Sequence, residues 1–585
     1  MRWKIKPELD EIARKKLSDF NDIEAQILFN RGITNSSDAL KFFTPDINDL
    51  QSPDKIFGAK KAAKQIVKAL KAHEKIVIYG DYDVDGISAT SILFDYLYRD
   101  LKADVVPYVP DRFEEGYGLS KIGLDNVLEL GAKLVITVDC GIKDAKLIKK
   151  YTDKNLKFIV SDHHTIPVDK KSGDFEVSKT ALAVVHPSLD KKYKYNNICA
   201  TTVVWKLVQL IHEEAAKHGL SKKEINFNKY LDIVALATVC DIMPLKDENR
   251  IIVNEGLKLI HNHEENFGIK ALSNIAQVNS DLFDAYHFGF VIGPRLNAAG
   301  RIEHALDGVR LLTSKDDLKI RNLASKLNDL NFKRQQITKK MLEEAMVDAQ
   351  KQVDEGKKLI FVSSDTWNEG IVGLVASKIN EKFHLPVLVA NFSDGFVKGS
   401  ARSINGFDIT NAISLNAELL EKFGGHNQAA GFKLKELNFD KFKSNIQEYA
   451  SLMITPEMIS KELNIDLVIT TDDATMDTIK SIAKFKPFGY GNPEPIVVVK
   501  DTRIYGTPTA IGQDKRHLKF SILSSNHEFI SVIGFNMIDK IDTIKTDSLY
   551  DLAGVLDINV WNGRTSIQII LRDLKPSDKK TSEKD

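Results

Sequence analysis

The sequence predicts an α/β protein with four parts: a parallel-sheet domain, a long linking helix, a smaller α/β domain and a C-terminal β-barrel. Three observations support this. Apolar runs alternate with helical patterns over residues 55–190, one helical pattern continues over residues 316–353, and short β-rich runs fill residues 463–574. Strands alternating with helices are typical of a parallel sheet covered on both faces, and regularly spaced short strands are typical of a small barrel.

The parallel sheet is predicted from four apolar runs separated by amphipathic stretches. They are KIVIY (75–79), DVVPYV (104–109), KLVITV (133–138) and KFIV (157–160). Short runs that are apolar throughout are expected for strands buried on both faces. Residues 200–310 are predicted to be mainly helical.

One long helix is predicted to link two lobes, because apolar residues recur at helical spacing and Gly356 closes the pattern. The recurring residues are Leu323, Leu327, Leu330, Met341, Ala345 and Ala349. The alternative is two consecutive helices with a break near Asn331.

The second α/β unit is predicted over residues 358–452, with the strands KLIFVSS and LPVLVA. In the barrel, Asn562-Gly563 between two alternating runs indicates a two-residue hairpin, and the strand spacing fits an OB-fold. The expected segments are 1–54 (packing on the core), 55–315 (catalytic domain), 316–355 (linking helix), 356–455 (second α/β domain), 460–575 (barrel) and 576–585 (disordered tail).

Composition excludes several classes of protein. Hydrophobic residues make up 43% and charged residues 28% of the 585 positions, as in ordinary globular proteins. Lys+Arg and Asp+Glu both number 81, so nucleic-acid binding would need local basic patches. The three cysteines form no C-x-x-C pair, which argues against disulfides and structural zinc and favours a reducing cytoplasm. The charged N-terminus is no signal peptide, and the apolar runs are too short to span a membrane.

Three carboxylates directly follow the first predicted strand, at Asp81, Asp83 and Asp85. Two carboxylates about 4 Å apart repel by about 4 kcal/mol at an effective dielectric of 20, so such a cluster indicates a solvated turn or a bound cation. An EF-hand calcium loop would need Glu at its twelfth position, where this chain has Ile92. A cation other than an EF-hand calcium is therefore the preferred interpretation.

Further candidate ligands follow the other strands. Asp139 ends the third run, Asp162-His163-His164 follows the fourth, and Asp241 follows the apolar run LDIVALAT. The carboxyl ends of parallel strands share one edge, so these side chains are expected to converge there. Carboxylates with one imidazole suit Mn²⁺ or Mg²⁺, and two ions bridged by Asp139 would clamp a phosphodiester and activate a water. The predicted ligands are Asp83, Asp85, Asp139, His163 and Asp241. Taken singly, His163 could be a core histidine and Asp241 a helix cap.

A phosphate site is predicted in the second α/β unit. Gly424-Gly425-His426 precedes an Ala-rich stretch that could begin a helix, whose free N–H groups bind phosphate well; the alternative is a tight turn with structural glycines. Ser400 and Arg402 lie on a neighbouring run, and Arg402 and His426 are the preferred phosphate contacts. In the barrel, Phe488, Tyr490 and Trp561 are candidate stacking surfaces, and Phe520 adds an aromatic to the charged run Lys515, Arg516, His517 and Lys519. Such aromatics are more often core residues.

These motifs together resemble RecJ-type exonucleases of the DHH phosphoesterase superfamily. The matching words are YGDYDVDG, TVDCG, SDHH, VCDIMPL, GPRLNAAGR, KGSARS, FGGHNQAAGF and PFGYGNPEP, spread over nearly the whole chain. The resemblance implies a DHH domain, a DHHA1 domain and an OB-fold. It also implies metal-dependent hydrolysis of single-stranded DNA from 5′ to 3′, in DNA repair and recombination.

The resemblance also assigns residues. It implies metal binding by the five predicted ligands, phosphate contact by His164, and support by Asp81 and Asp162. Arg295, Asn297 and Arg301 would line the cleft between the lobes. The implied partners are single-stranded DNA, a single-stranded-DNA-binding protein and a helicase, for a cytoplasmic monomer without membrane contact.

Two positions depart from the family pattern. Tyr79 stands where many superfamily members carry a metal-binding His, and Asn368 stands where the family word usually has His. A phenol is a poor ligand at neutral pH, so waters would complete one ion's shell. Two other functions stay open: a phosphodiesterase for short oligonucleotides or cyclic dinucleotides, and an inactive replication scaffold. The segment after Leu463 argues against the first, and the complete ligand set argues against the second.

Overall fold

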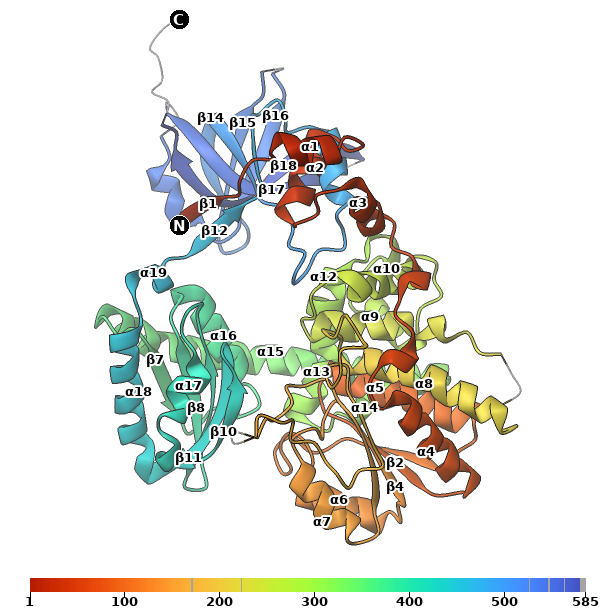
Figure 1. Cartoon of the computed structure of the whole chain (residues 1–585). Helices are drawn as coiled ribbons and strands as arrows, with labels where there is room; N and C mark the ends of the chain where they lie inside the picture. The colour runs from red at the N-terminus through yellow and green to blue at the C-terminus, as the bar shows by residue number, and fades with distance from the viewer. Residues whose placement is uncertain (170–171, 222–223, 526, 546–547, 562, 579–585) are drawn as a thin grey trace, which may run out of the picture. The chain divides into compact units, whose positions relative to one another are not determined.

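The computed structural model describes residues 1–169, 172–221, 224–525, 527–545, 548–561 and 563–578. The chain forms two compact units: residues 47–459, and residues 1–46 together with residues 460–585. In the larger unit a five-stranded parallel sheet has the order β3-β2-β4-β5-β6. Figure 1 labels its neighbouring strands β2 and β4. Its strands are β2 (Ile76–Tyr79), β3 (Val105–Tyr108), β4 (Leu134–Val138), β5 (Lys157–Ser161) and β6 (Ala183–Val185).

Helices cover both faces of this sheet because successive side chains of each strand point to opposite faces. Ile76 and Ile78 share one core with α4 (Ala59–Lys71), α5 (Val84–Asp95) and α8 (Ala200–Lys217). Val77 and Tyr79 share the other core with α6 (Lys121–Glu129) and α7 (Ala145–Thr152). The helical region that follows comprises α9 (Leu231–Cys240), α10 (Asp247–His261), α11 (Phe267–Ile275), α12 (Ala285–His287), η6 (Phe288–Ile292), α13 (Gly293–Ile302) and α14 (Leu306–Thr313).

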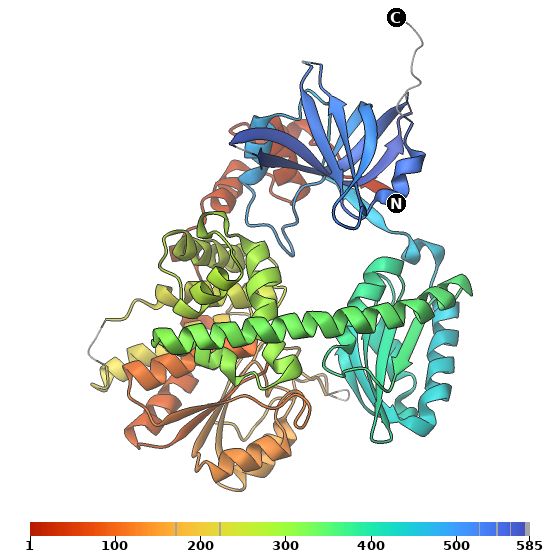
Figure 2. The ribbon, with the colours of Figure 1, turned by 180° about the vertical axis from the view of Figure 1, so that it is seen from behind.

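The linking helix is a single element, α15 (Asp317–Asp354), of 38 residues, without a break at Asn331 (Figure 2). The Asp316 side chain caps its first turn by accepting from the Lys319 N–H at 3.0 Å. Gly356 follows the helix at φ +76°, a conformation that costs glycine little. The first half packs on α13 and α14, and the second half packs on β7 and α16.

The second sheet has the order β10-β11-β9-β8-β7, and only β7 and β8 run parallel. Its strands are β7 (Ile360–Ser364), β8 (Val387–Ser393), β9 (Phe396–Arg402), β10 (Leu420–His426) and β11 (Ala429–Lys435), and its helices are α16 (Val372–Phe383), α17 (Ile409–Ser414) and α18 (Phe439–Met453). The Ala-rich stretch after His426 is therefore strand β11. A helix start at Gly424-Gly425-His426 was the wrong prediction, because this segment pairs with β11 as a hairpin.

The smaller unit contains a closed barrel, in which β14, β15, β16, β18 and β17 pair in turn and β17 returns to β14. The strands are β14 (Val497–Ile511), β15 (His517–Leu523), β16 (Phe529–Gly534), β17 (Leu549–Trp561) and β18 (Arg564–Pro576), and β13 (Leu467–Ile469) adds to β14. The predicted hairpin joins β17 to β18, where residues 561 and 564 pair. Asn562, the side chain of Trp561 and residues 579–585 of the tail lie outside the described residues. Phe520 is buried in the barrel core and is no stacking surface.

The N-terminal segment corrects one expectation. Residues 1–46 pack with the barrel, not on the catalytic core: β1 (Arg2–Ile5) pairs in parallel with β12 (Glu462–Ile465). Side chains of α2 (Asp22–Asn30) and α3 (Ser36–Phe43) share a core with α20 (Met476–Ala483) and the barrel. Strand pairing across this sequence separation leaves no local pattern, so the sequence could not show it. None of the helices in the described part of the chain combines the length and apolar character needed to cross a bilayer.

Candidate metal centre and phosphate site

The candidate site lies at the carboxyl edge of the parallel sheet. Loops after β2, β4 and β5 bring Asp81 to Asp85, Asp139 and Asp162 to His164 to this edge, and Asp241 joins them from the C-terminal end of α9. The residues form three groups of three, and each residue of a group contributes one possible ligand atom. Within each group these atoms all lie within 4.8 Å of one another. The groups are Asp139–His163–His164, Asp85–His163–Asp241 and Asp81–Asp83–Asp139. All five predicted metal ligands therefore converge, and Asp139 belongs to two of the groups.

The loop after β2 is held by close packing. Asp83 caps α5 by accepting from the N–H groups of Asp85 at 2.9 Å and Gly86 at 3.1 Å. A Cβ at Gly86 would lie 2.6 Å from the backbone nitrogen of Asp81, so only glycine fits there without displacing the loop. Asp139 adopts φ +64°, a left-handed conformation that is uncommon for residues other than glycine and recurs at functional sites.

His163 is oriented toward the carboxylates by its own backbone contact. Its Nδ1 lies 3.1 Å from the carbonyl oxygen of Ile198, which accepts the ring N–H and leaves Nε2 free as a ligand. Nε2 lies 3.2 Å from Asp139 Oδ1, 3.6 Å from Asp241 Oδ2 and 3.7 Å from Asp85 Oδ2.

Asp85 is buried, and its carboxylate has backbone hydrogen-bond donors. Its carboxylate accepts from the N–H groups of Ala200 at 2.7 Å and Thr201 at 2.8 Å, at the start of α8. Free N–H groups and the helix dipole favour negative charge at this end of a helix.

Other atoms of the cluster have no partner of their own. Four buried atoms lack a hydrogen bond among the described residues: Asp81 Oδ1, Asp139 Oδ1, His163 Nε2 and Asp241 Oδ2. Burial, followed by the neighbouring carboxylates, raises the pKa of Asp139 and of Asp241 well above the usual range. Buried polar atoms are normally satisfied, so converging orphaned oxygens with one imidazole nitrogen fit divalent cations such as Mn²⁺ or Mg²⁺.

Asp162 positions His164 and belongs to no ligand group. Its Oδ1 accepts from the Nδ1 of His164 at 2.8 Å, and its Oδ2 accepts from the Ile142 N–H at 2.9 Å. Burial alone would raise the pKa of Asp162, but the hydrogen bond from His164 and its positive charge hold that pKa below the usual range. With Nδ1 held by Asp162, the Nε2 of His164 has the Tyr117 hydroxyl as its neighbour at 3.2 Å.

Arginines from one loop, two helices and one strand lie beside this centre: Arg112, Arg301, Arg334 and Arg402. Burial, followed by the positive charges of Arg112, Arg334 and Arg402, lowers the pKa of Arg301 to about 9. Arg301 donates to the Gly370 carbonyl oxygen at 3.1 Å, and Arg402 donates to Ser400 Oγ at 3.0 Å. Among the described residues none of these arginines forms an ion pair with a carboxylate. Cations gathered without acids indicate an anion-binding site.

The remaining predicted residues are spread around this cluster. Arg295 and Asn297 are half-buried on α13, the helix that also carries Arg301. Gly424, Gly425 and His426 lie on the exposed hairpin strand β10. Burial, followed by the charges of Lys143 and His164, lowers the pKa of His426.

The two departures from the family pattern have local partners. The Tyr79 hydroxyl donates to Glu115 Oε2 and to the Gly118 carbonyl oxygen, each at 3.4 Å, in the core with α6. Asn368 accepts from the Gly370 N–H at 2.9 Å and so shapes the loop that Arg301 contacts. Neither departure disturbs the cluster of carboxylates.

Comparisons with known proteins agree with this architecture. The model for the "DHH family, N-terminal domain" matches residues 75–238, that for the "DHHA1 domain" residues 356–452, and that for the "RecJ OB domain" residues 465–573. The single-stranded-DNA-specific exonuclease RecJ of Bacillus subtilis is 33% identical over 99% of this chain and 71% of that protein. The protein of the same name from Haemophilus influenzae is 31% identical over 91% of this chain and 93% of its own length.

This chain belongs to the RecJ family. A crystal structure of RecJ from Thermus thermophilus in complex with Mn²⁺ is similar at a TM-score of 0.80 and 27% identity, over 99% of this chain and 80% of that one. The predicted fold class, with its DHH, DHHA1 and OB-fold parts, is confirmed.

Sequence reasoning missed three residues that the RecJ-family fold brings to the site. The Tyr117 hydroxyl lies 3.2 Å from the ring nitrogens of His164. Arg112 lies over the ring of Tyr82, 4.9 Å from its centroid, and Arg334 reaches the cluster from α15. The only signal for the two arginines was their basic charge. Because the chain has 81 Lys and Arg residues, that charge does not distinguish them.

Proposed function

We propose that this chain is an exonuclease that hydrolyses single-stranded DNA from the 5′ end with Mn²⁺ or Mg²⁺, in DNA repair and recombination. The observation that carries the proposal is the buried set of orphaned carboxylates and one imidazole nitrogen, flanked by unpaired arginines. Support comes from the relatives that are named single-stranded-DNA-specific exonucleases and from the RecJ structure determined with Mn²⁺.

The proposed metal ligands are those at the sheet edge. Asp83, Asp85, Asp139, His163 and Asp241 would hold two ions, with Asp139 shared between them and Asp81 supporting the loop. When bound, such ions supply an activated water and neutralise charge on a phosphodiester.

The role of the chain itself is to position the substrate and a proton. Asp162 fixes His164 so that its Nε2 can approach an oxygen of the scissile phosphate. The Tyr117 hydroxyl lies 3.2 Å from both nitrogens of the same ring and helps to orient it. A histidine oriented by a carboxylate can hold or deliver a proton during hydrolysis.

The 5′ polarity is proposed from the cations beside the metal centre. Arg301, Arg402 and Ser400 would bind the terminal phosphate of the strand, with His426 at the edge of the site. A phosphomonoester carries a charge of about −1.5 to −2 at neutral pH, more than the single charge of an internal diester. Gathered arginines therefore favour the end of a strand that carries a phosphate.

Two alternatives make different predictions. A phosphodiesterase for short oligonucleotides would prefer a dinucleotide to a long strand, and an inactive scaffold would hydrolyse neither. The barrel argues for a long substrate, and the converging ligands argue for activity.

The proposed partners rest on family membership: they are a single-stranded-DNA-binding protein and a helicase. That the protein acts as a monomer is a proposal on the same ground.

The decisive experiment digests end-labelled single-stranded 50-mers in Mn²⁺, Mg²⁺ or EDTA. We expect digestion with either metal, none with EDTA, and a block of the 5′ end to stop digestion more than a block of the 3′ end. A 5′-phosphate should be preferred to a 5′-hydroxyl. Equal digestion from both ends would remove the polarity, and preference for a dinucleotide would favour the first alternative.

A further inference from the structure

We propose that the linking helix α15 carries a second phosphate-binding position for the DNA strand, formed by Arg334 together with Arg295. This inference rests on the proposed function. Arg301 and Arg402 form the proposed site for the terminal phosphate. Arg334 and Arg295 would contact a second phosphate, further along the same strand. In this view α15 binds substrate as well as joining the two lobes.

Arg295 on α13 and Arg334 on α15 add two positive charges to the site formed by Arg301 and Arg402. Arg295 and Arg301 are six residues apart on this helix, which is about 9 Å along its axis at 1.5 Å per residue. Arg334 lies on α15 six residues after Asn328, whose Oδ1 accepts from Arg295 Nε at 3.2 Å. The charges of Arg295 and Arg334, and those of Arg334 and Arg301, act on one another in agreement with this placement. The positive side chains therefore lie near one another where α13 packs on α15.

Arg334 lacks the partners that a structural arginine would have. Its Nε is buried without a hydrogen bond among the described residues, and so is the Oδ1 of Asn331 one turn earlier. A buried guanidinium nitrogen left unpaired is costly, and a phosphate oxygen would satisfy it with a charge-assisted bond. The side chain is only half-buried, so a strand could reach it.

Arg295 is held in place but keeps donors free. Its Nε donates to Asn328 Oδ1 at 3.2 Å, and its Nη1 donates to the Val291 carbonyl oxygen at 2.7 Å. A guanidinium has five N–H donors in a fixed fork, so others remain for a ligand. The contact with Asn328 also ties Arg295 to the helix that carries Arg334.

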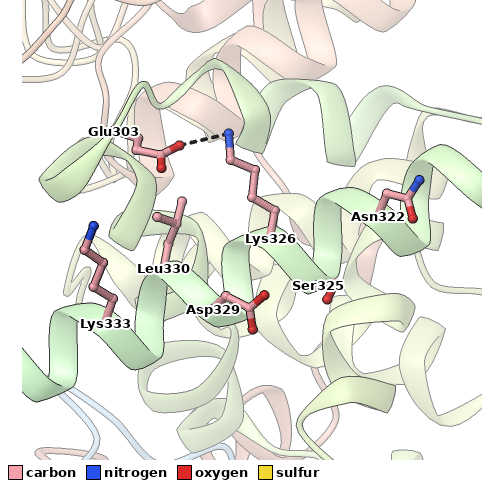
Figure 3. Close-up of a pocket in the computed structure, with 7 residues that line it drawn as sticks. All are labelled: Glu303, Asn322, Ser325, Lys326, Asp329, Leu330 and Lys333. Carbon is pink, nitrogen blue, oxygen red and sulfur yellow. Dashed lines mark ion pairs between the residues drawn. The ribbon is translucent and has the colours of Figure 1, made fainter.

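The chain offers a matched control on the next residue. Lys333 is exposed and lines an open hollow of about 460 Å³ on another side of α15, beside Lys326 and its partner Glu303 (Figure 3). It carries the same charge as Arg334, and successive helix residues point in directions about 100° apart.

The test compares Arg334→Gln with Lys333→Gln in the full-length protein with Mn²⁺. On a 5′-phosphorylated 20-mer, Arg334→Gln should raise KM about tenfold, the effect of losing one good contact. The slope of log KM against log salt should fall by about 0.7, the value for one single-strand phosphate contact. The loss should shrink on a trinucleotide, and Lys333→Gln should match the wild type throughout.

Several outcomes would overturn the inference. One is a slope of log KM against log salt that is unchanged in Arg334→Gln. Another is an equal rise of KM on the 20-mer and on the trinucleotide, because Arg334 would then act through packing or through the metal centre. Arg334→Lys keeps the charge and should keep the slope, and a lost slope there would also count against it. A wild-type protein that hydrolyses no DNA would instead remove the proposed function.

Discussion

Asp139 shows how a single residue can serve the site at the expense of its own stability. Its backbone lies in the left-handed region, its carboxylate is buried, and its Oδ1 lacks a hydrogen bond among the described residues. Each of these features destabilises the metal-free protein by an amount on the order of 1–3 kcal/mol. Their combination at one position points to function, because a residue chosen only for folding would avoid all three.

Replacing Asp139 by Asn should separate function from stability. We expect kcat/KM on single-stranded DNA to fall at least about 1000-fold, since a ligand shared by both ions is lost. In EDTA the variant should melt at a higher temperature than the wild type, because repulsion among the buried carboxylates is relieved. Asp125→Asn, which removes a half-buried carboxylate on α6, is the control for both measurements. Retained hydrolysis would contradict the two-ion arrangement.

At the scale of elements, the turn between β2 and α5 is the part on which the site depends most. Asp83 caps the helix, and Gly86 allows the backbone of Asp81 to pass beneath it. The strand end and the helix start therefore fix three carboxylates through one short loop.

Gly86→Ala tests this dependence. The new Cβ would meet backbone atoms of Asp81 at 2.6 Å, so the loop must shift. We expect Mn²⁺ affinity, measured by calorimetric titration, to fall about 10- to 100-fold, as for other changes that support metal ligands. Gly431→Ala, whose Cβ would have no neighbour nearer than 3.9 Å, should bind Mn²⁺ normally. Normal affinity in Gly86→Ala would mean that the loop adapts.

At the scale of the whole molecule, two units have separate hydrophobic cores. The helices of residues 1–46 share their core with the barrel, where Phe485 lies 4.9 Å from Phe43 between ring centroids. The proposed metal ligands all belong to residues 47–459. Metal binding and barrel stability should therefore be independent.

Scanning calorimetry should show this independence as two unfolding transitions. Mn²⁺ at about 100 times its Kd should stabilise only the unit with the ligands, by about 2.7 kcal/mol. Phe485→Ala should destabilise only the other unit, by about 3–5 kcal/mol, while leaving Mn²⁺ affinity unchanged. A single transition that responds to both changes would show that the units unfold together.

The sequence alone determined strands β2 to β5 of the parallel sheet, the long helix and the position of the acidic cluster. Asp83, Asp139 and His163 each follow an apolar strand, and the carboxyl ends of parallel strands must share an edge. Tertiary structure decided what depends on contacts between distant segments. It paired β1 with β12, placed Gly424–His426 in a hairpin strand and brought Arg112 and Arg334 near Arg301, at the proposed phosphate site. A strand pattern is local, whereas the partner of an edge strand or of a lone arginine is set only when the chain packs.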